Sequence, residues 1–345
     1  MFLASDNTGP AHPQVMDHVL AANAHYAMPY GADPVMENVR GLVRDVFEAP
    51  EAAVYLVATG TAANALALSC YCQPWQTVFC SPVAHIHEDE CNAPEFYTGG
   101  AKLTLVPGTD KITPEALRKS IAFEEGRGVH GPQRGPVSIT QVTERGSVYT
   151  LEELHALTDV AKSFGLPAHL DGARFANALV ALDCTAAEMS WKAGVDVVSF
   201  GGTKNGCMGV EAVVFFDPEK AWEFELRRKR GAHLFSKHRF LSAQMEGYLT
   251  DGLWLQAAAQ ANARAAQLAE GLRDKGAGFL YEPQANMIFA TFSRATHQKL
   301  HDAGAKYYVW EGELEGDNPD EMLAARLVCD WSITEEQIDQ FLSHF

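Results

Sequence analysis

The chain has 345 residues, of which 47% are hydrophobic and 21% are charged, and it contains no low-complexity tract. These proportions are typical of a fully folded globular protein. A net charge of -17, from 27 basic and 44 acidic side chains without a long basic stripe, argues against a nucleic-acid partner. No apolar run is long enough to cross a bilayer and no export signal opens the chain, so we expect no membrane association.

Seven cysteines are scattered along the chain without a C-x-x-C pair. An odd, dispersed set fits neither a disulfide framework nor a zinc ribbon. We therefore expect a protein of the reducing cytoplasm with no metal site.

Short apolar, β-branched runs alternate with alanine-rich helical stretches between about residues 50 and 216. This rhythm is typical of βαβ units, and several runs are apolar without alternation, as in strands covered on both faces. It predicts an α/β domain whose central, mostly parallel sheet is flanked by helices. The expected strands are residues 52–58, 77–81, 102–107, 136–142, 166–171, 195–200 and 211–216.

The rhythm changes after residue 252. A long helix is expected at 253–275, followed by strands at 286–292, 305–310 and 323–330, a helix near 297–304 and a closing helix. We expect a smaller α+β domain over residues 253–345 beside a large domain over residues 1–252. Ser332 and Glu335 have the spacing of a capping box at the start of the closing helix.

Two of the expected strands are followed by residues suited to binding a ligand. Gly60 and Thr61 open an alanine-rich helix, where free backbone amides can bind phosphate, although a helix cap explains Thr61 equally well. His85 follows the next strand in the sequence AHIHEDE. It is compatible with a catalytic histidine, with a metal ligand beside His87, or with a surface histidine in an acidic loop.

Asp171 and Lys204 lie at the ends of two further expected strands. Cofactors bind beyond the carboxyl ends of parallel strands, and a lysine in such a loop can form a Schiff base; an ordinary exposed lysine is the alternative. A carboxylate at Asp171 suits a pyridinium nitrogen, or else a structural ion pair with Arg174. Arg326, in a strand of small side chains, needs a carboxylate from a surface neighbour or from a substrate held across the domain cleft.

Taken in order, the segments SDN, MPYGADP, TGTAAN, AHIHEDE, VH, HLDGAR, GTKNG and ARLVCDW resemble the low-specificity L-threonine aldolases. These are pyridoxal-phosphate enzymes of the aspartate aminotransferase fold. The resemblance covers nearly the whole chain, and the ordered set is specific even though each piece is not. It also implies a homotetramer arranged as a dimer of dimers.

The resemblance assigns roles to residues in this chain. Lys204 forms the Schiff base with pyridoxal phosphate, and Asp171 contacts the ring nitrogen. Gly60 and Thr61 hold the phosphate, and His85 lies over the ring.

The resemblance also implies a substrate site. Ser5, Arg174 and Arg326 bind the substrate carboxylate, with Arg174 beside the cofactor. His130 stands near the substrate hydroxyl, and Tyr30 matches a tyrosine near the subunit interface.

Two departures from the family pattern affect the expected site. Asp89 occupies a place that is usually aromatic, which predicts a side-chain pocket open to substrates bulkier than threonine; the alternative is one more acid in a solvated run. Members also carry an arginine that reaches the phosphate from a neighbouring subunit, for which Lys237 or Arg239 is a candidate here.

The implied reaction is retro-aldol cleavage of a β-hydroxy-α-amino acid to glycine and an aldehyde. His85, His130 or a water molecule is the candidate base. Two alternatives stay open, because the cofactor's placement does not fix the reaction. The first is another reaction of the same cofactor, either β-elimination or transamination, and the second is a catalytically silent, cofactor-binding regulatory protein.

Overall fold

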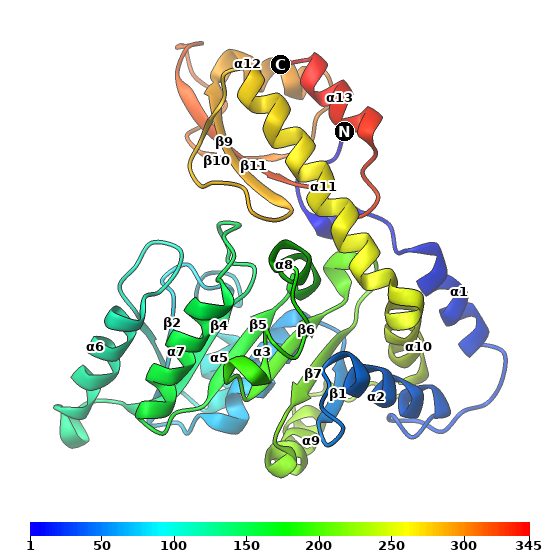
Figure 1. Cartoon of the computed structure of the whole chain (residues 1–345), viewed down its shortest axis with the longest axis vertical. Helices are drawn as coiled ribbons and strands as arrows, with labels where there is room; N and C mark the ends of the chain where they lie inside the picture. The colour runs from blue at the N-terminus through cyan, green and yellow to red at the C-terminus, as the bar shows by residue number, and fades with distance from the viewer.

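The computed structural model describes residues 1–345 and contains two separate β-sheets (Figure 1). The larger sheet has the strand order β1-β7-β6-β5-β4-β2-β3. Both pairs made by β7 are antiparallel and the other pairs are parallel, so β7 alone runs against its neighbours. The prediction of an α/β fold with a mostly parallel sheet is confirmed. The strands are β1 (Ala53–Val57), β2 (Gln76–Cys80), β3 (Lys102–Leu105), β4 (Gln133–Thr140), β5 (Ala168–Gly172), β6 (Val197–Gly201) and β7 (Glu211–Phe215).

Helices pack on both faces of this sheet. They are α1 (Pro13–Ala22), α2 (Pro34–Val46), α3 (Gly60–Tyr71), α4 (His85–Glu88), α5 (Ala93–Thr98), α6 (Pro114–Glu125), α7 (Leu151–Ser163), α8 (Phe175–Leu182), α9 (Ala221–Arg230) and α10 (Arg239–Leu249). In Figure 1, α3 and α5 lie behind the strands and α6, α7 and α8 lie in front. Because β5, β6 and β7 are therefore covered on both sides, every one of their residues is buried.

The C-terminal part of the chain builds the smaller sheet, whose order is β10-β11-β9-β8 and whose pairs are all antiparallel. Its strands are β8 (Gly278–Phe279), β9 (Met287–Ser293), β10 (Tyr308–Glu311) and β11 (Met322–Val328), and its helices are α12 (Arg294–Asp302) and α13 (Glu335–Ser343). The long helix α11 (Leu253–Asp274) joins the two parts of the molecule in Figure 1. Its first turn packs into a core cluster of 48 residues around the larger sheet, and its second half packs into a separate cluster of 17.

The N-terminal segment is bonded to the smaller sheet. The amide of Leu3 donates to the carbonyl of Lys306, and the amide of Val328 donates to the carbonyl of Leu3, each at 2.8 Å. The following residues therefore begin between the two sheets, close to the carboxyl ends of the large-sheet strands. None of the helices combines the length and the apolar character needed to span a bilayer.

The start of α13 differs from the prediction. The capping box is formed by Thr334 and Gln337, two residues later than the pair expected from the sequence. The reason lies at Asp330, whose Oδ1 accepts both the amide and the hydroxyl of Ser332 at 2.6 Å. This local turn occupies the Ser332 side chain, so it cannot cap the helix.

Candidate active site

Two adjoining cavities open where the strands of the larger sheet reach their carboxyl ends. The first, of about 360 Å³, is lined by residues at the ends of β1, β2, β5 and β6, and the second, of about 320 Å³, extends from the same edge to the smaller sheet. Both are in the size range of small-molecule sites. Of the predicted residues, the first cavity brings together Gly60, Thr61, His85, Asp171 and Lys204, and the second brings together Ser5, His85, Asp89, Arg174, Lys204 and Arg326.

Lys204 lies in a short 3-10 turn (Thr203–Asn205) directly after β6, where the two cavities meet. The neighbouring Asn205 is buried and fixes this turn, because its Nδ2 donates to the hydroxyl of Tyr248 and to the carbonyl of Trp254, each at 2.8 Å. Gly206 then leaves the turn with a positive φ of 113°, a conformation that favours glycine. The local sequence therefore holds the lysine backbone rigidly while its amine stays at the cavity wall.

Asp171 is almost completely buried at the end of β5, with 2% of its surface exposed. Its Oδ1 accepts the amide of Ala173 at 3.1 Å, and its Oδ2 accepts Nδ2 of Asn64 at 2.9 Å. Arg174 does not pair with it, which rules out the expected structural alternative. A carboxylate buried with neutral donors only is well suited to a cationic ring nitrogen.

His85 is the first residue of α4 and contacts a buried acid. Its Nδ1 lies 3.0 Å from Oε1 of Glu90, whose side chain is fully buried. This hydrogen bond raises the pKa of His85, although burial acts in the opposite direction. No three His, Cys, Asp or Glu side chains lie close enough together to hold a metal ion.

One end of the first cavity is formed by the start of α3. Thr59 is the N-cap, and its side chain accepts the amide of Ala62 at 3.2 Å. The hydroxyl of Thr61 is therefore not used as a cap, and the first amides of the helix have no partner within it. A Cβ built at Gly60 meets nothing within 4 Å, so open space lies directly over this backbone.

Arg174 is held by an acid that the sequence analysis did not single out. Its Nε and Nη2 donate to Oδ2 and Oδ1 of Asp6 at 2.6 and 3.0 Å, and both side chains are buried. Burial raises the pKa of Asp6, but the charges of Arg174 and Lys204 and the hydrogen bonds from Arg174 and Asn286 together outweigh it, so the net pKa is lowered. Arg174 therefore faces the second cavity with a fixed guanidinium.

Arg326 enters the same cavity from β11 and has no carboxylate partner in the chain. It donates to the carbonyl of Ala4 at 3.2 Å and contacts the sulfur of Met287 at 3.8 Å. Burial and the nearby charge of Arg174 both lower its pKa. Two guanidiniums beside Ser5 thus share one cavity, which is a suitable setting for a substrate carboxylate.

Four residues named from the resemblance lie outside these cavities. His130 is exposed in the turn before β4. The first residue of β4 pairs with the first residue of β2, so this turn lies at the amino end of the parallel strands. Within the chain it is therefore not near the other site residues. Tyr30 is exposed beneath Nζ of Lys229, 4.9 Å from its ring centroid. Neither Lys237 nor Arg239 lines either cavity.

The cavity residues that were not predicted from the sequence include four polar side chains, Asn64, Glu90, Glu211 and Arg145. Asn64 and Glu90 lie in two segments that carry the family resemblance, TGTAAN and AHIHEDE. Their closeness in sequence to Thr61 and His85 could have predicted that they line the same cavity. Glu211 is buried, and its Oε2 accepts the amide of Gly202 at 2.8 Å. Burial raises its pKa to about 7.

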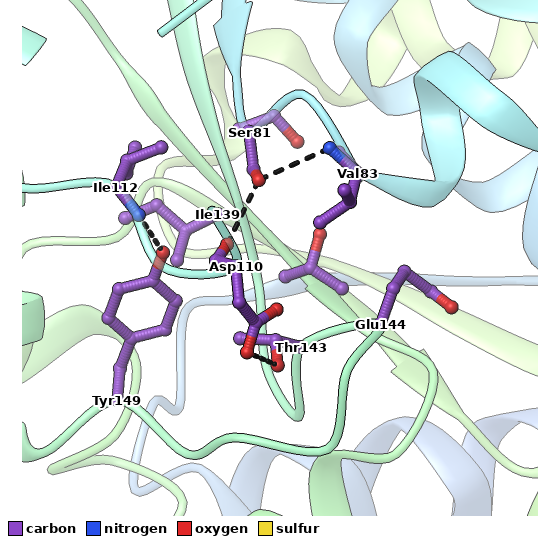
Figure 2. A pocket seen from close by; sticks show the side chains of 11 residues that line it. Ser81, Val83, Asp110, Ile112, Ile139, Thr143, Glu144 and Tyr149 are labelled. Carbon is purple, nitrogen blue, oxygen red and sulfur yellow. Dashed lines mark hydrogen bonds between the residues drawn. The ribbon is translucent and has the colours of Figure 1, made fainter. Parts of the chain in front are cut away.

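A third cavity, of about 10 Å³, adjoins the second cavity and shares Glu144 with it. Figure 2 shows Asp110 pointing toward Thr143, whose hydroxyl donates to its Oδ2 at 2.8 Å, while Ser81 donates to the Asp110 carbonyl at 2.9 Å. The space fits about one water molecule and no substrate. These bonds tie the loops after β2, β3 and β4 together beneath the site.

Comparisons with known proteins agree with this geometry. Residues 3–295 match the model of the beta-eliminating lyase family. A low-specificity L-threonine aldolase of Pseudomonas sp. (strain NCIMB 10558) is 40% identical over 97% of this chain and 94% of its own length. A threonine aldolase structure from Leishmania major, 26% identical, superposes with a TM-score of 0.92 over 99% of this chain and 97% of that one.

A more distant structure shares the fold alone. It is a serine palmitoyltransferase of S. paucimobilis with bound PLP, 18% identical, with a TM-score of 0.70 over 100% of this chain and 86% of that one. The match to the family model and the extent of identity decide the assignment. The chain belongs to the beta-eliminating lyase family and, within it, to the low-specificity L-threonine aldolases.

Proposed function

We propose that the protein uses pyridoxal phosphate to cleave β-hydroxy-α-amino acids of the L-threonine and L-allo-threonine type into glycine and an aldehyde. One observation carries this proposal. The cavity that contains Lys204 and Asp171 opens directly into a second cavity that contains two guanidiniums, Arg174 and Arg326. A cofactor and an amino-acid carboxylate can therefore be held side by side.

The residues of the first cavity suit each part of this cofactor. Lys204 would hold its aldehyde carbon and Asp171 its ring nitrogen, while the free amides at Gly60 and the hydroxyl of Thr61 would hold its phosphate. His85 lines the same cavity and would cover the ring. When bound, pyridoxal phosphate supplies an electron sink for the pair released from the α-carbon.

The residues of the second cavity would orient the substrate. Arg174, Arg326 and Ser5 would bind its carboxylate and thereby select which bond at the α-carbon is aligned for cleavage. Nε2 of His85 makes no hydrogen bond within the chain and is the group placed to accept the proton of the β-hydroxyl, directly or through water. His130 would need to come from another subunit to take part.

The reaction class is tested by product analysis of the cofactor-loaded protein. Purified protein is mixed with L-threonine, L-allo-threonine, phenylserine and their D-forms, and aldehyde and glycine are measured. We expect equal amounts of both products from the L-forms without a keto-acid co-substrate. A 2-oxo acid with ammonia would indicate β-elimination, a requirement for a keto acid would indicate transamination, and no turnover would favour a regulatory protein.

The proposal also includes the oligomeric state of the protein, its cellular compartment and the boundary between its two domains. The family resemblance supports a homotetramer arranged as a dimer of dimers, with Tyr30 near an interface. All seven cysteines are free thiols, which supports a reducing cytoplasmic location. A division at residue 253 is supported by the start of α11 at that position.

A further inference from the structure

A continuous line of hydrogen bonds connects the buried acid of β5 with the histidine of α4. Nδ2 of Asn64 lies 2.9 Å from Oδ2 of Asp171 and 2.9 Å from Oε1 of Glu90, and the same Glu90 oxygen lies 3.0 Å from Nδ1 of His85. Asn64, Glu90 and Asp171 are each at most 3% exposed. The four side chains come from α3, α4, the loop after it and β5, so tertiary packing alone brings them together.

The donors and acceptors in this line can be assigned from chemistry. A carboxylate has no proton to donate to the amide oxygen of Asn64. The Asn64 amide must therefore direct its two N–H groups at Asp171 and Glu90. Both carboxylates then act as acceptors. With Oε1 of Glu90 already accepting from Asn64, the contact with His85 is satisfied when Nδ1 of His85 carries the proton and Nε2 does not.

We propose that Glu90 is a positioning residue that holds His85 with its proton on Nδ1, so that Nε2 faces the substrate cavity as the proton acceptor. This inference rests on the proposed function, and it names Glu90 as the group that fixes the tautomer of the catalytic base His85. In the step itself, Nε2 takes the proton of the substrate β-hydroxyl, the oxygen forms the aldehyde C=O, and the bond between the α- and β-carbons breaks. The electron pair left on the α-carbon would be taken up by pyridoxal phosphate, and one proton returns to that carbon when glycine forms. The resulting imidazolium is stabilised by the Glu90 carboxylate, and no further reactant is needed.

Other charges also face His85 and affect its titration. Asp171 from β5, Glu144 from the loop after β4 and Glu90 all favour the protonated ring, whereas burial disfavours it. Lys204 lines both cavities beside it. Of these groups only Glu90 is hydrogen-bonded to the ring, so its removal should have the largest single effect.

The test reads His85 directly by ¹⁵N NMR of the cofactor-loaded, histidine-labelled protein, with the signal assigned from a His85→Asn sample. In the parent we expect a protonated Nδ1 and a bare Nε2 above the histidine pKa. In Glu90→Gln we expect the pKa to fall by about one pH unit, the size of a charged hydrogen bond. An unchanged pKa, or a parent ring protonated on Nε2, overturns the proposal.

A matched control exists elsewhere in the chain. Nδ1 of His18 lies 2.9 Å from Oε2 of Glu246, and the His18 side chain is 27% exposed against 28% for His85. Glu246→Gln should leave the His85 signal unchanged. If Glu90→Gln does not fold, Glu90→Asp serves instead: the shorter carboxylate should lower the pKa of His85 in the same direction but by less, and an unchanged value again overturns the proposal.

Kinetics separate this inference from the proposed function. The acid limb of the kcat/KM profile for L-threonine should move down by about one pH unit in Glu90→Gln, and the value at neutral pH should fall roughly tenfold. If the parent cleaves threonine but the variant profile is unmoved, only the role of Glu90 fails. If the parent does not cleave any substrate while the NMR shift is present, only the proposed reaction fails.

Discussion

The two walls of the cleft differ in how firmly their charged side chains are held. On the wall made by the larger sheet, Asp171, Arg174 and Glu211 are buried and each is bonded to the protein. On the wall made by the smaller sheet, Arg326 is bonded only to a carbonyl and a sulfur atom, and Tyr308 is 56% exposed.

Under the proposed function, this difference separates the groups that hold the cofactor from the group that binds only the substrate. Groups that hold a cofactor have to keep one geometry through every turnover, so their positions are fixed by hydrogen bonds before any ligand arrives. A group that binds a substrate carboxylate must keep unused donors for it, and Arg326 keeps such donors because no carboxylate of the chain pairs with it. Under the proposed function, changes on the first wall should therefore affect cofactor binding and stability, with Arg174 affecting substrate binding as well, whereas changes on the second wall should affect substrate kinetics alone.

The largest effect is expected from Lys204→Ala. Without the amine, the cofactor has no covalent attachment in the chain, so activity should fall at least about a thousandfold and the visible absorbance of the bound cofactor should be lost. Spectra and turnover of dialysed protein measure both. Retention of the parent spectrum after borohydride treatment and dialysis would contradict the assignment of Lys204.

Arg174→Ala should mainly destabilise the protein. It leaves the Asp6 carboxylate buried without its bidentate partner, and breaking a buried ion pair in this way costs about 3–5 kcal/mol. The free energy of unfolding from urea titration measures the loss. Arg326→Ala is the matched control, and equal losses in both variants would mean that the two walls do not differ.

Glu211 should make stability depend on pH. Its pKa is raised from 4.5 to about 7 in the folded protein, so its contribution is present below pH 4.5 and is lost as the pH rises through 7. Between pH 5 and pH 7 the parent should lose roughly 2–3 kcal/mol of unfolding free energy relative to Glu211→Gln. Parallel pH profiles for the two proteins would show that Glu211 ionises normally.

Arg326→Ala should raise KM and lower kcat together, because carboxylate anchoring both binds the substrate and orients the bond that breaks. We expect kcat/KM to fall roughly tenfold to a hundredfold, with the cofactor spectrum unchanged. Arg326→Lys should restore little, since a single ammonium cannot replace the planar pair of donors. Parent-like kinetics would assign Arg326 to a purely structural role.

The smallest effect is expected at Asp89, which is exposed and lines the second cavity with Arg145 and Trp310. Replacing a short acid by a ring removes space near the substrate β-carbon. In Asp89→Phe the ratio of kcat/KM for phenylserine to that for threonine should fall several-fold, which is less than the about 10-fold or more of a methylene in a closed hydrophobic pocket because Asp89 is exposed. An unchanged ratio would place Asp89 outside the substrate contacts.

The fold could be predicted well from the sequence because its signals are local. All seven expected strands of the larger sheet are present, and apolar runs between helical stretches sufficed to find them. The capping of α13 could not be predicted, because the competing bond from Asp330 to Ser332 depends on side-chain conformation. The bonds of Leu3 to Lys306 and Val328 could not be predicted either, because they join residues far apart in the chain.

The first cavity could be predicted because its residues follow strand ends. Gly60, His85, Asp171 and Lys204 lie together because parallel strands end at one edge. The roles of these residues stay predictions. Partners that come from distant segments, such as Asp6 beside Arg174, have no such signal, since nothing in their spacing links residues 168 positions apart.

The central claim is that Lys204 alone carries the cofactor on the fixed wall of the cleft. The direct measurement is borohydride reduction of the pyridoxal-phosphate-loaded protein, followed by proteolysis and mass spectrometry of every lysine-containing peptide. We predict one stoichiometric phosphopyridoxyl label, on Lys204, and none on the neighbours in sequence, Lys192 and Lys220. A label on any other lysine, or no label in protein that retains its activity, would contradict the claim.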